Sequence, residues 1–233
     1  MPPENHILSL LGEADMAALQ PYLENVELPV RLVLETPNVP ISHVFFMTSG
    51  IASVVAGTGS EDIEAGILGA DGMTGTAIVL AASQTPNKTI IQIGGTGWRI
   101  EAGRFREEMQ KSASMHRCFM RSAFAFNIQT THSVLANGRA KVDERLARWL
   151  LMAHDRIDGN ELAVTHEFLS LMLGVRRAGV TTVVGSFEDL GYVTAERGLI
   201  TVLNRAGLKS LAGGFYGVPE KVQLHLTGWH CKH

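Results

Sequence analysis

The sequence predicts an α+β fold in which a β-rich region is followed by a set of helices. Seven of the eight prolines lie before residue 87, and 11 of the 24 glycines lie between Gly50 and Gly103, so the turn residues gather at one end. The segment 115–135 has neither glycine nor proline, and the segment 165–184 has the apolar spacing of two short helices joined by a turn. The change of fold class is therefore expected near residue 104.

Composition places the chain among globular proteins. It has 233 residues, of which 45% are hydrophobic, enough to bury one large core or two modest ones. It contains no run of about 18 apolar residues, and its start has neither the basic end nor the apolar centre of a signal peptide. Cys118 and Cys231 are too few for a disulfide framework, and free thiols suit a reducing compartment. We therefore expect a cytoplasmic protein.

The first hundred residues are expected to form one short helix and then strands. Met16, Leu19 and Leu23 share one face of a helix over Ala14–Leu23. The apolar pieces that follow are short and separated by turn residues, which is typical of an antiparallel barrel or jelly roll. These pieces are Val30–Leu34, Val44–Met47, Ile51–Val55, Ile63–Leu68, Ile78–Leu80, Thr89–Ile93 and Trp98–Ile100.

A long helix is expected from Met115 to Leu135, with a length of about 30 Å. One of its faces repeats at alternating steps of four and three, the spacing of a coiled-coil seam. Its residues are Phe119, Ala123, Phe126, Thr130, Ser133 and Asn137. This face predicts a homodimer contact, although it could also pack on the chain's own β domain. A second apolar face is available for that packing, so we expect both contacts; it consists of Met120, Phe124, Ile128 and Leu135.

A hinge and a further helix are expected next. Asn137-Gly138 suits a left-handed C-terminal cap and makes a natural hinge. The helix that follows ends at Asp158-Gly159-Asn160, and its buried stripe consists of Val142, Leu146, Trp149, Leu150 and Ala153.

The segment Thr165–Val184 has the pattern of a helix-turn-helix. Gly174 supplies the turn, Ser170 is small where the helices cross, and the corner's apolar positions are Leu169, Leu173, Val175, Val180 and Val183. Four polar residues would face outward, where DNA-binding proteins carry groups for phosphates and base edges; they are Arg176, Arg177, Thr181 and Thr182.

The second helix of this corner has a competing interpretation. Val180–Val184 is an unbroken β-branched run after Gly179 and could form a strand. The apolar positions 180, 183, 184, 187 and 190 instead follow helical spacing and stop before Gly191, which favours a helix.

The segments around the corner complete a winged domain. Thr165 can cap the first helix, and Glu167 suits its positive first turn. Tyr192–Thr194 and Leu199–Leu203 flank a tight turn that contains Arg197, which predicts a hairpin wing. A final helix is expected, with Asn204 as its N-terminal cap. No pattern is visible beyond Gly213-Gly214, so we expect a loosely held tail.

This order of elements resembles the Crp-Fnr family of bacterial transcription regulators. The resemblance covers about residues 10–212 and is most specific in Val142-Asp-Glu-Arg-Leu-Ala-Arg-Trp-Leu-Leu151 and in Thr165–Leu190. It implies a homodimer that inserts one helix into each of two major-groove turns of a palindromic DNA site, about 34 Å apart. The sequence shows no nucleophile-base-acid constellation and no phosphate-cradling glycine loop, so we do not expect an enzyme. It also implies RNA polymerase as a partner.

The resemblance divides the chain into four parts. A cyclic-nucleotide-binding-like β roll covers 10–112, a dimerisation helix and hinge 113–138, the winged helix-turn-helix 139–212 and a tail 213–233. Residues 1–138 carry a net charge of −5 and residues 139–212 a net charge of +1, in keeping with two domains.

The nucleotide-binding cassette of the family is degenerate here. In nucleotide-binding members a Gly-Glu pair holds the ribose and an Arg-Ser pair holds the phosphate, whereas this chain has Gly75-Thr76 and Pro86-Asn87. Because the arginine is missing and Pro86 lacks a backbone donor, we do not expect cyclic AMP to bind. Thr130-Thr131 stands where the family offers hydroxyls to the adenine, but these hydroxyls alone cannot hold a nucleotide.

The resemblance also assigns roles on the recognition helix. Arg177 is the base-reading candidate, and Arg176 and His166 are expected at phosphates, although His166 equally fits an ordinary exposed residue. Ala178 and Thr182 replace the Glu and second Arg of nucleotide-responsive members. The preferred DNA sequence therefore cannot be carried over.

Other functional classes are weighed by counting ligands. Two cysteines cannot supply the four ligands of an iron-sulfur cluster, and His116 and Cys118 point to different sides of a helix. A tail cluster could bind a soft metal, but a weakly chelating tail is the commoner cause of such a pattern, so no cofactor is expected; it consists of His225, His230, Cys231 and His233. Two alternatives remain open. One is a cupin-like small-molecule binder, although cupins need a His-x-His pair and the barrel region here has only His43. The other is a two-domain protein without a DNA role.

Overall fold

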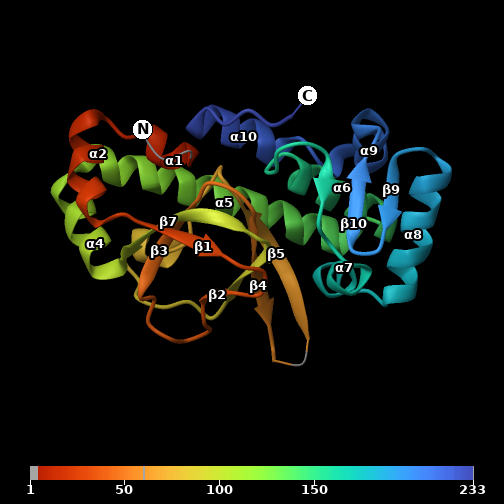
Figure 1. The fold of residues 1–233 in the computed structure, drawn as a ribbon, viewed down its shortest axis with the longest axis horizontal. Coiled ribbons are helices and arrows are strands. Elements are labelled where there is room, and N and C mark those ends of the chain that lie inside the picture. Colours follow the sequence, from red (N-terminus) through yellow and green to blue (C-terminus); the bar gives the residue numbers. More distant parts are fainter. Residues whose placement is uncertain (1–4, 60, 233) are drawn as a thin grey trace.

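The computed structural model of the protein describes residues 5–59 and 61–232 (Figure 1). A β roll lies against one long helix, α5 (Ala113–Arg139), which leads into a helical domain at its far end. The C-terminal helix α10 (Val218–Thr227) packs along α5 and ends near the N-terminal helix α1 (His6–Ser9). This arrangement confirms the predicted α+β fold.

The β roll consists of two antiparallel sheets that do not close into a barrel. One sheet has the order β1-β7-β3, and the other has the order β2-β6-β4-β5. Six of the seven predicted apolar pieces fall in these strands, the first of them only at its end. The strands are β1 (Glu24–Leu28), β2 (Val33–Glu35), β3 (His43–Met47), β4 (Ile51–Gly57), β5 (Asp62–Leu68), β6 (Lys88–Ile93) and β7 (Gly95–Glu101).

One local prediction in the β roll is wrong, and one strand was not predicted. The piece Ile78–Leu80 is not a strand, because residues Thr76–Val79 form the short helix α3 and bury Ile78 and Val79 in the core beside α5. Gly75 begins this helix with a left-handed φ of 76°, which glycine adopts freely. Strand β1 was not expected, because it pairs along one side of β7 and buries only Leu28 fully, so it shows no apolar run.

The core of the N-terminal domain is built around three phenylalanine rings. Phe119 lies 4.8 Å from Phe105 and 5.9 Å from Phe46 between ring centroids, and all three side chains are fully buried. The helix predicted over 14–23 is present as α2 (Glu13–Leu19) and a final 3-10 turn, η1 (Gln20–Tyr22). The helix α4 (Ala102–Lys111) begins where the Glu101 side chain accepts hydrogen bonds from two backbone N–H groups.

The hinge lies slightly later than predicted. Gly138 is inside α5, which continues to Arg139, and the chain first becomes extended at Ala140. The helix α6 (Val142–His154) then starts, with the Glu144 carboxylate accepting a hydrogen bond from Lys141 N at 2.7 Å. The hinge therefore depends on a break in backbone conformation rather than on the glycine.

The helical domain follows the predicted order. Its core joins α6, α7 and α8 to the wing strands and contains Leu150, Leu169, Val180 and Phe187. No single helix among residues 5–59 and 61–232 is long and apolar enough to cross a membrane; only the bent pair α7 and α8 meets that criterion when taken together. The remaining elements are β8 (Glu161–Leu162), α7 (His166–Leu173), α8 (Arg177–Asp189), β9 (Val193–Glu196), β10 (Leu199–Val202) and α9 (Arg205–Ala212).

The tail is more ordered than predicted. After the 3-10 turn η2 (Gly213–Phe215), Gly217 adopts a φ of 114° and donates its N–H to the Glu220 carboxylate, which starts α10. This helix buries only Pro219 and Thr227 deeply, so its sequence carries no strong apolar stripe. The expectation of a loosely held tail was wrong because the tail is held by polar contacts, which periodicity does not reveal.

Candidate nucleic-acid interface

The helix-turn-helix is present as the corner between α7 and α8, whose axes differ by 111°. Gly174 closes α7 with a φ of 60°, and Val175 N bonds Ser170 O at 3.0 Å across the turn. Thr165 Oγ1 accepts a hydrogen bond from Phe168 N at 3.1 Å, so the predicted cap is confirmed. These contacts fix the entry and exit of the corner, and the angle is typical of the motif.

The second element of the corner is a helix, as the apolar spacing predicted. Val180, Val184 and Phe187 are at most 1% exposed and pack into the domain core, while Val183 is partly buried beside them. The strand alternative is therefore wrong, because tertiary burial of one face outweighs the β-branched propensity of the run.

The opposite face of α8 is exposed. Arg176, Arg177, Thr181 and Thr182 all lie on it, as predicted. Thr181 Oγ1 and Thr182 Oγ1 donate to carbonyls one turn earlier, at 3.2 and 3.0 Å, and His166 Nδ1 lies 3.0 Å from Thr181 Oγ1. The structure thus gathers His166 of α7 and the polar residues of α8 on one surface.

Arg177 has an acidic neighbour that sequence reasoning did not place. The Glu167 carboxylate lies 4.0 Å from Arg177 Nε, and both side chains are more than two-thirds exposed. An exposed pair at this distance is weak. The guanidinium therefore stays available for a ligand, while Glu167 limits the directions in which it points.

The wing lies beside this surface. Strands β9 and β10 pair antiparallel, and Gly198 makes their turn with a φ of 79°. Ala195 N donates to the Glu188 carboxylate of α8 at 2.9 Å, which ties the wing to the second helix. Arg197 at the turn is exposed and has no hydrogen-bond or ion-pair partner among the described residues. The wing therefore presents the exposed guanidinium of Arg197 at its turn.

Comparison with known families bears on the domain that carries this surface. Residues 144–211 match the family model of the Crp-like helix-turn-helix domain. The chain carries a Crp-like helix-turn-helix domain. No curated protein sequence matches the chain.

Solved structures extend the likeness to the rest of the fold. A Eubacterium rectale transcriptional regulator assigned to the Crp/Fnr family shares 20% identity at a TM-score of 0.68, over 88% of this chain and 97% of that one. The c-di-GMP-responsive regulator CLP of Xanthomonas campestris shares 16% identity at a TM-score of 0.64, over 82% of this chain and 99% of that one. FixK2 of Bradyrhizobium japonicum shares 13% identity at a TM-score of 0.67, over 82% of this chain and 98% of that one. The chain therefore has the fold of Crp/Fnr transcription regulators, with the Crp-like domain at its C-terminal side.

Four of the residues predicted to form a degenerate effector pocket have a polar group that is hydrogen-bonded within the chain. Gly75 N, at the start of α3, donates to the buried Glu35 carboxylate at 2.8 Å, and the Thr89 hydroxyl donates to its other oxygen. Thr130 and Thr131 bond carbonyls of their own helix at 2.8 and 2.9 Å. Thr76 lies in the first turn of α3, and Asn87 N bonds Thr85 Oγ1.

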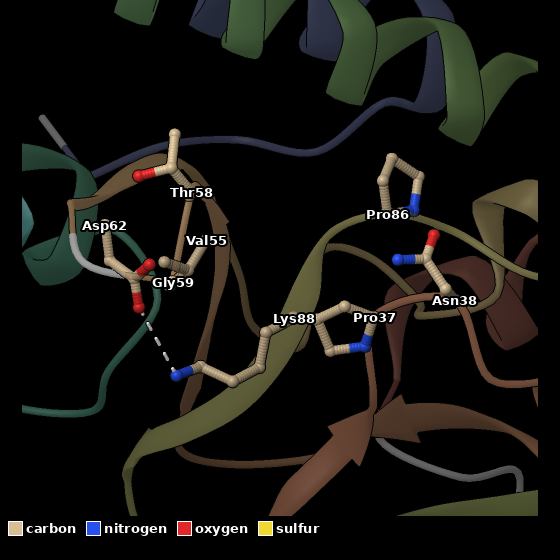
Figure 2. A pocket seen from close by; sticks show the side chains of 9 residues that line it. Pro37, Asn38, Val55, Thr58, Gly59, Asp62, Pro86 and Lys88 are labelled. Atoms are coloured by element: carbon tan, nitrogen blue, oxygen red, sulfur yellow. Dashed lines mark ion pairs between the residues drawn. The ribbon is translucent and has the colours of Figure 1, made fainter.

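A cavity of about 490 Å³ opens beside the predicted pocket (Figure 2). Of the predicted residues, only Pro86 lines it. Lys88 and Asp62 form an ion pair in its lining, with Lys88 Nζ 3.6 Å from Asp62 Oδ2. Sequence reasoning missed this pair because the two residues come from β6 and β5, which only the sheet brings together.

The two faces of α5 are exchanged relative to the prediction. Phe119 and Ala123 are buried in the N-terminal core, and Phe126 packs over Gly66 of β5, where an added Cβ would come within 2.9 Å of its ring. Because Phe119 and Ala123 are buried inside the chain, the N-terminal half of this face is not available as a dimer seam. The side chains left exposed include Met120 and Phe124, at 46% and 53%, followed by Val134 and Leu135 at 73% and 45%. The spacing of apolar residues predicts both apolar faces of α5, but it does not determine which face packs on the β roll.

Three of the four tail residues considered for metal binding lie within the described part of the chain. No group of three or more His, Cys, Asp or Glu among the described residues could hold a metal ion. His225 and His230 are exposed, Cys231 is half-buried, and His233 lies outside the described residues.

Proposed function

We propose that the protein is a sequence-specific DNA-binding transcription regulator that binds a palindromic operator as a homodimer. The observation that carries this proposal is the surface of α8, which exposes two arginines and two threonines on a rigid corner in a Crp-like domain. Phosphate contacts position such a helix, and base-edge contacts give it sequence preference.

The individual roles follow from position on this surface. Arg177 is the first residue of α8, where side chains reach base edges in the major groove, and its fork can bond a guanine at O6 and N7 together. Arg176 is the cap before it and is proposed to meet the phosphate backbone with His166. The capped start of α7 at Thr165 and the free guanidinium of Arg197 on the wing extend the same phosphate-binding surface.

A homodimer is supported by the exposed apolar face of α5. Met120 and Phe124 are followed by Ile128 and Leu135 on one side of the helix, and no described segment of the chain covers Met120, Phe124 or Leu135. Large exposed apolar patches mark interaction sites, and a two-fold axis along α5 would place two copies of α8 on one face of DNA. RNA polymerase is proposed as the partner through which the bound dimer acts.

Cyclic AMP is not proposed as the effector. A bound phosphate needs donors and positive charge, but the N–H of Gly75 is taken by Glu35. Lys88, the one cation among the described residues that line the neighbouring cavity, is paired with Asp62. The buried carboxylate of Glu35 would also repel an incoming phosphate.

The experiment is selection of duplex DNA from a random pool by the full-length protein, followed by titration at stated salt. We expect enrichment of a two-fold symmetric sequence bound far more tightly than random DNA. Recovery of sequences without a shared motif, bound no better than random duplex, would refute the proposal. It would instead favour a small-molecule-binding protein without a DNA role.

A further inference from the structure

Three segments that are distant in the sequence meet at one buried carboxylate. Asp71 lies in the turn after β5 of the β roll, Arg156 follows α6 of the DNA-binding domain, and Gln223 lies on α10. Arg156 Nη2 and Gln223 Nε2 both donate to Asp71 Oδ2 at 2.6 Å, and Arg156 Nε donates to Oδ1 at 3.0 Å. The side chains of Asp71 and Arg156 are each only 3% exposed. The C-terminal helix therefore completes an ion pair that joins the two domains.

The same C-terminal segment is fixed to the DNA-binding domain by a second carboxylate. Asp155 Oδ1 accepts from Arg205 Nη2 at 2.5 Å and from the backbone N of Lys232 at 3.1 Å, and Asp155 Oδ2 accepts from the Tyr216 hydroxyl at 2.7 Å. Tyr216 precedes α10 and Lys232 follows it. Both ends of the segment are thus held at one acidic residue beside Arg156.

The far end of the segment is attached to the N-terminal domain. His6 Nε2 lies 2.7 Å from Thr227 O, and the His6 ring meets the Trp229 ring edge-on at 5.2 Å. The preceding residue, Asn5, donates to Met47 O and Gly72 O of the β roll. Residues 213–232 therefore run out from the DNA-binding domain, along α5, to the N-terminal domain and back (Figure 1).

We propose that residues 213–232 form a strap that sets the orientation of the DNA-binding domain on the β roll, with Gln223, Asp71 and Arg156 as its positioning residues. The covalent link between the domains is a short extended break at Ala140, which by itself allows the domain to swing. A buried ion pair that crosses the interface tolerates the loss of a partner poorly. Without Gln223, the C-terminal helix loses its side-chain hydrogen bond to Asp71, and the Asp71–Arg156 pair loses the partner that ties it to the strap.

The strap sets the position of α8 relative to the β roll. Its effect on DNA affinity rests on the proposed function, whereas its effect on domain orientation does not. When the orientation of the DNA-binding domains is fixed before binding, less conformational entropy is lost on binding two half-sites at once. A single half-site does not report on orientation in this way.

The test compares Gln223→Ala and Asp71→Asn with Lys221→Ala, a control on the same helix whose exposed side chain has no partner among the described residues. Spin labels at Glu13→Cys and Ser210→Cys, in a Cys118→Ser/Cys231→Ser background diluted with unlabelled protein, report the distance between the domains. We expect one narrow distance distribution in the parent and the control, and a broadened or displaced one in both strap variants. Affinity for the selected two-half-site DNA should fall roughly tenfold, with half-site DNA changed by less than about twofold.

An unchanged distance distribution in both strap variants would overturn the proposal, and so would equal broadening in the Lys221 control. If the parent protein selects no DNA, the regulator assignment fails while the distance measurement still decides on the strap. Far-ultraviolet circular dichroism and a cooperative thermal transition in each variant separate loss of orientation from loss of folding.

Discussion

At the surface of α8, neighbouring residues are expected to do different work. Arg176 is the N-terminal cap and Arg177 the first helical residue, so their side chains leave the backbone about 100° apart. Among the described residues, Arg177 has a carboxylate nearby, that of Glu167, whereas Arg176 has no ion-pair partner. Direction decides whether a guanidinium meets a base edge or a phosphate.

We predict that Arg177→Ala costs about 1–3 kcal/mol on the selected site and relaxes discrimination at one base pair per half-site. Arg176→Ala should weaken selected and random DNA alike and flatten the salt dependence by roughly one counterion per subunit. Titrations of both variants on both DNAs over a range of salt test this. Loss of base preference in the Arg176 variant alone would reverse the assignment.

A second residue-scale prediction concerns Glu64 at the contact between the β roll and α6. Its carboxylate accepts from Ser53 Oγ at 2.5 Å and from Trp149 Nε1 at 2.8 Å, and its burial raises the pKa of Glu64 to about 7. The folded protein then keeps a proton that the unfolded chain has lost, so this contribution to stability is full below pH 4.5 and is lost as the pH rises through 7.

Glu64→Gln should remove this loss, because the amide stays neutral and can bond the same two partners. We expect the variant to gain roughly 1–3 kcal/mol of unfolding free energy relative to the parent between acidic pH and pH 8. Denaturant titrations at several pH values measure it, with the exposed Glu27→Gln as control. Parallel stability curves for parent and Glu64 variant would contradict the assignment.

At the scale of elements, α5 shows both what the sequence can predict and where it stops. The length of the helix and its two apolar faces are local properties, and both were predicted. The partner of each face is not local, because Phe119 is buried by Phe46 and Phe105 from other elements. The face that lies against the β roll is the one predicted for the dimer.

The same limit applies to other elements. The Thr165 cap, the Asn204 cap and the wing were predicted because each depends on residues close in the chain. The helix α3 and the ordered tail were missed, because burial against α5 and the Asp71 contact with Gln223 decide them. The candidate DNA-contact residues could be predicted to share one exposed surface because they lie close together in the chain. The Lys88–Asp62 cavity was missed because its two residues come from different strands.

The exposed face of α5 makes a prediction about assembly. Phe124→Glu should convert a dimer into monomers at micromolar concentration, because it places two carboxylates near the two-fold axis of an apolar seam. Leu80→Glu changes an equally exposed apolar residue on the β roll and should leave the dimer intact. Sedimentation velocity distinguishes the two, and a Phe124 variant that stays dimeric would move the interface elsewhere.

At the scale of the whole molecule, the β roll has the fold found in Crp/Fnr structures, while Thr76, Pro86 and Asn87 stand where we would expect Glu, Arg and Ser in a nucleotide-binding cassette. We predict no calorimetric binding of cyclic AMP below about millimolar concentration, because a phosphate without its arginine lacks a charged hydrogen bond typically worth about 1.5–3 kcal/mol. Micromolar affinity that disappears in Lys88→Ala would contradict this and would show that Lys88 has exchanged Asp62 for the phosphate.

The helical domain presents the exposed face of α8 as its candidate DNA surface, and we propose that this helix reads the base sequence. The direct test is titration of the Arg176→Ala/Arg177→Ala double variant against the parent on the selected operator, with circular dichroism confirming the fold. The exposed sites of both residues predict a folded protein that has lost the preference for the operator and most of its affinity for random duplex. Binding by the double variant with parental affinity and salt dependence would remove α8 from the interface.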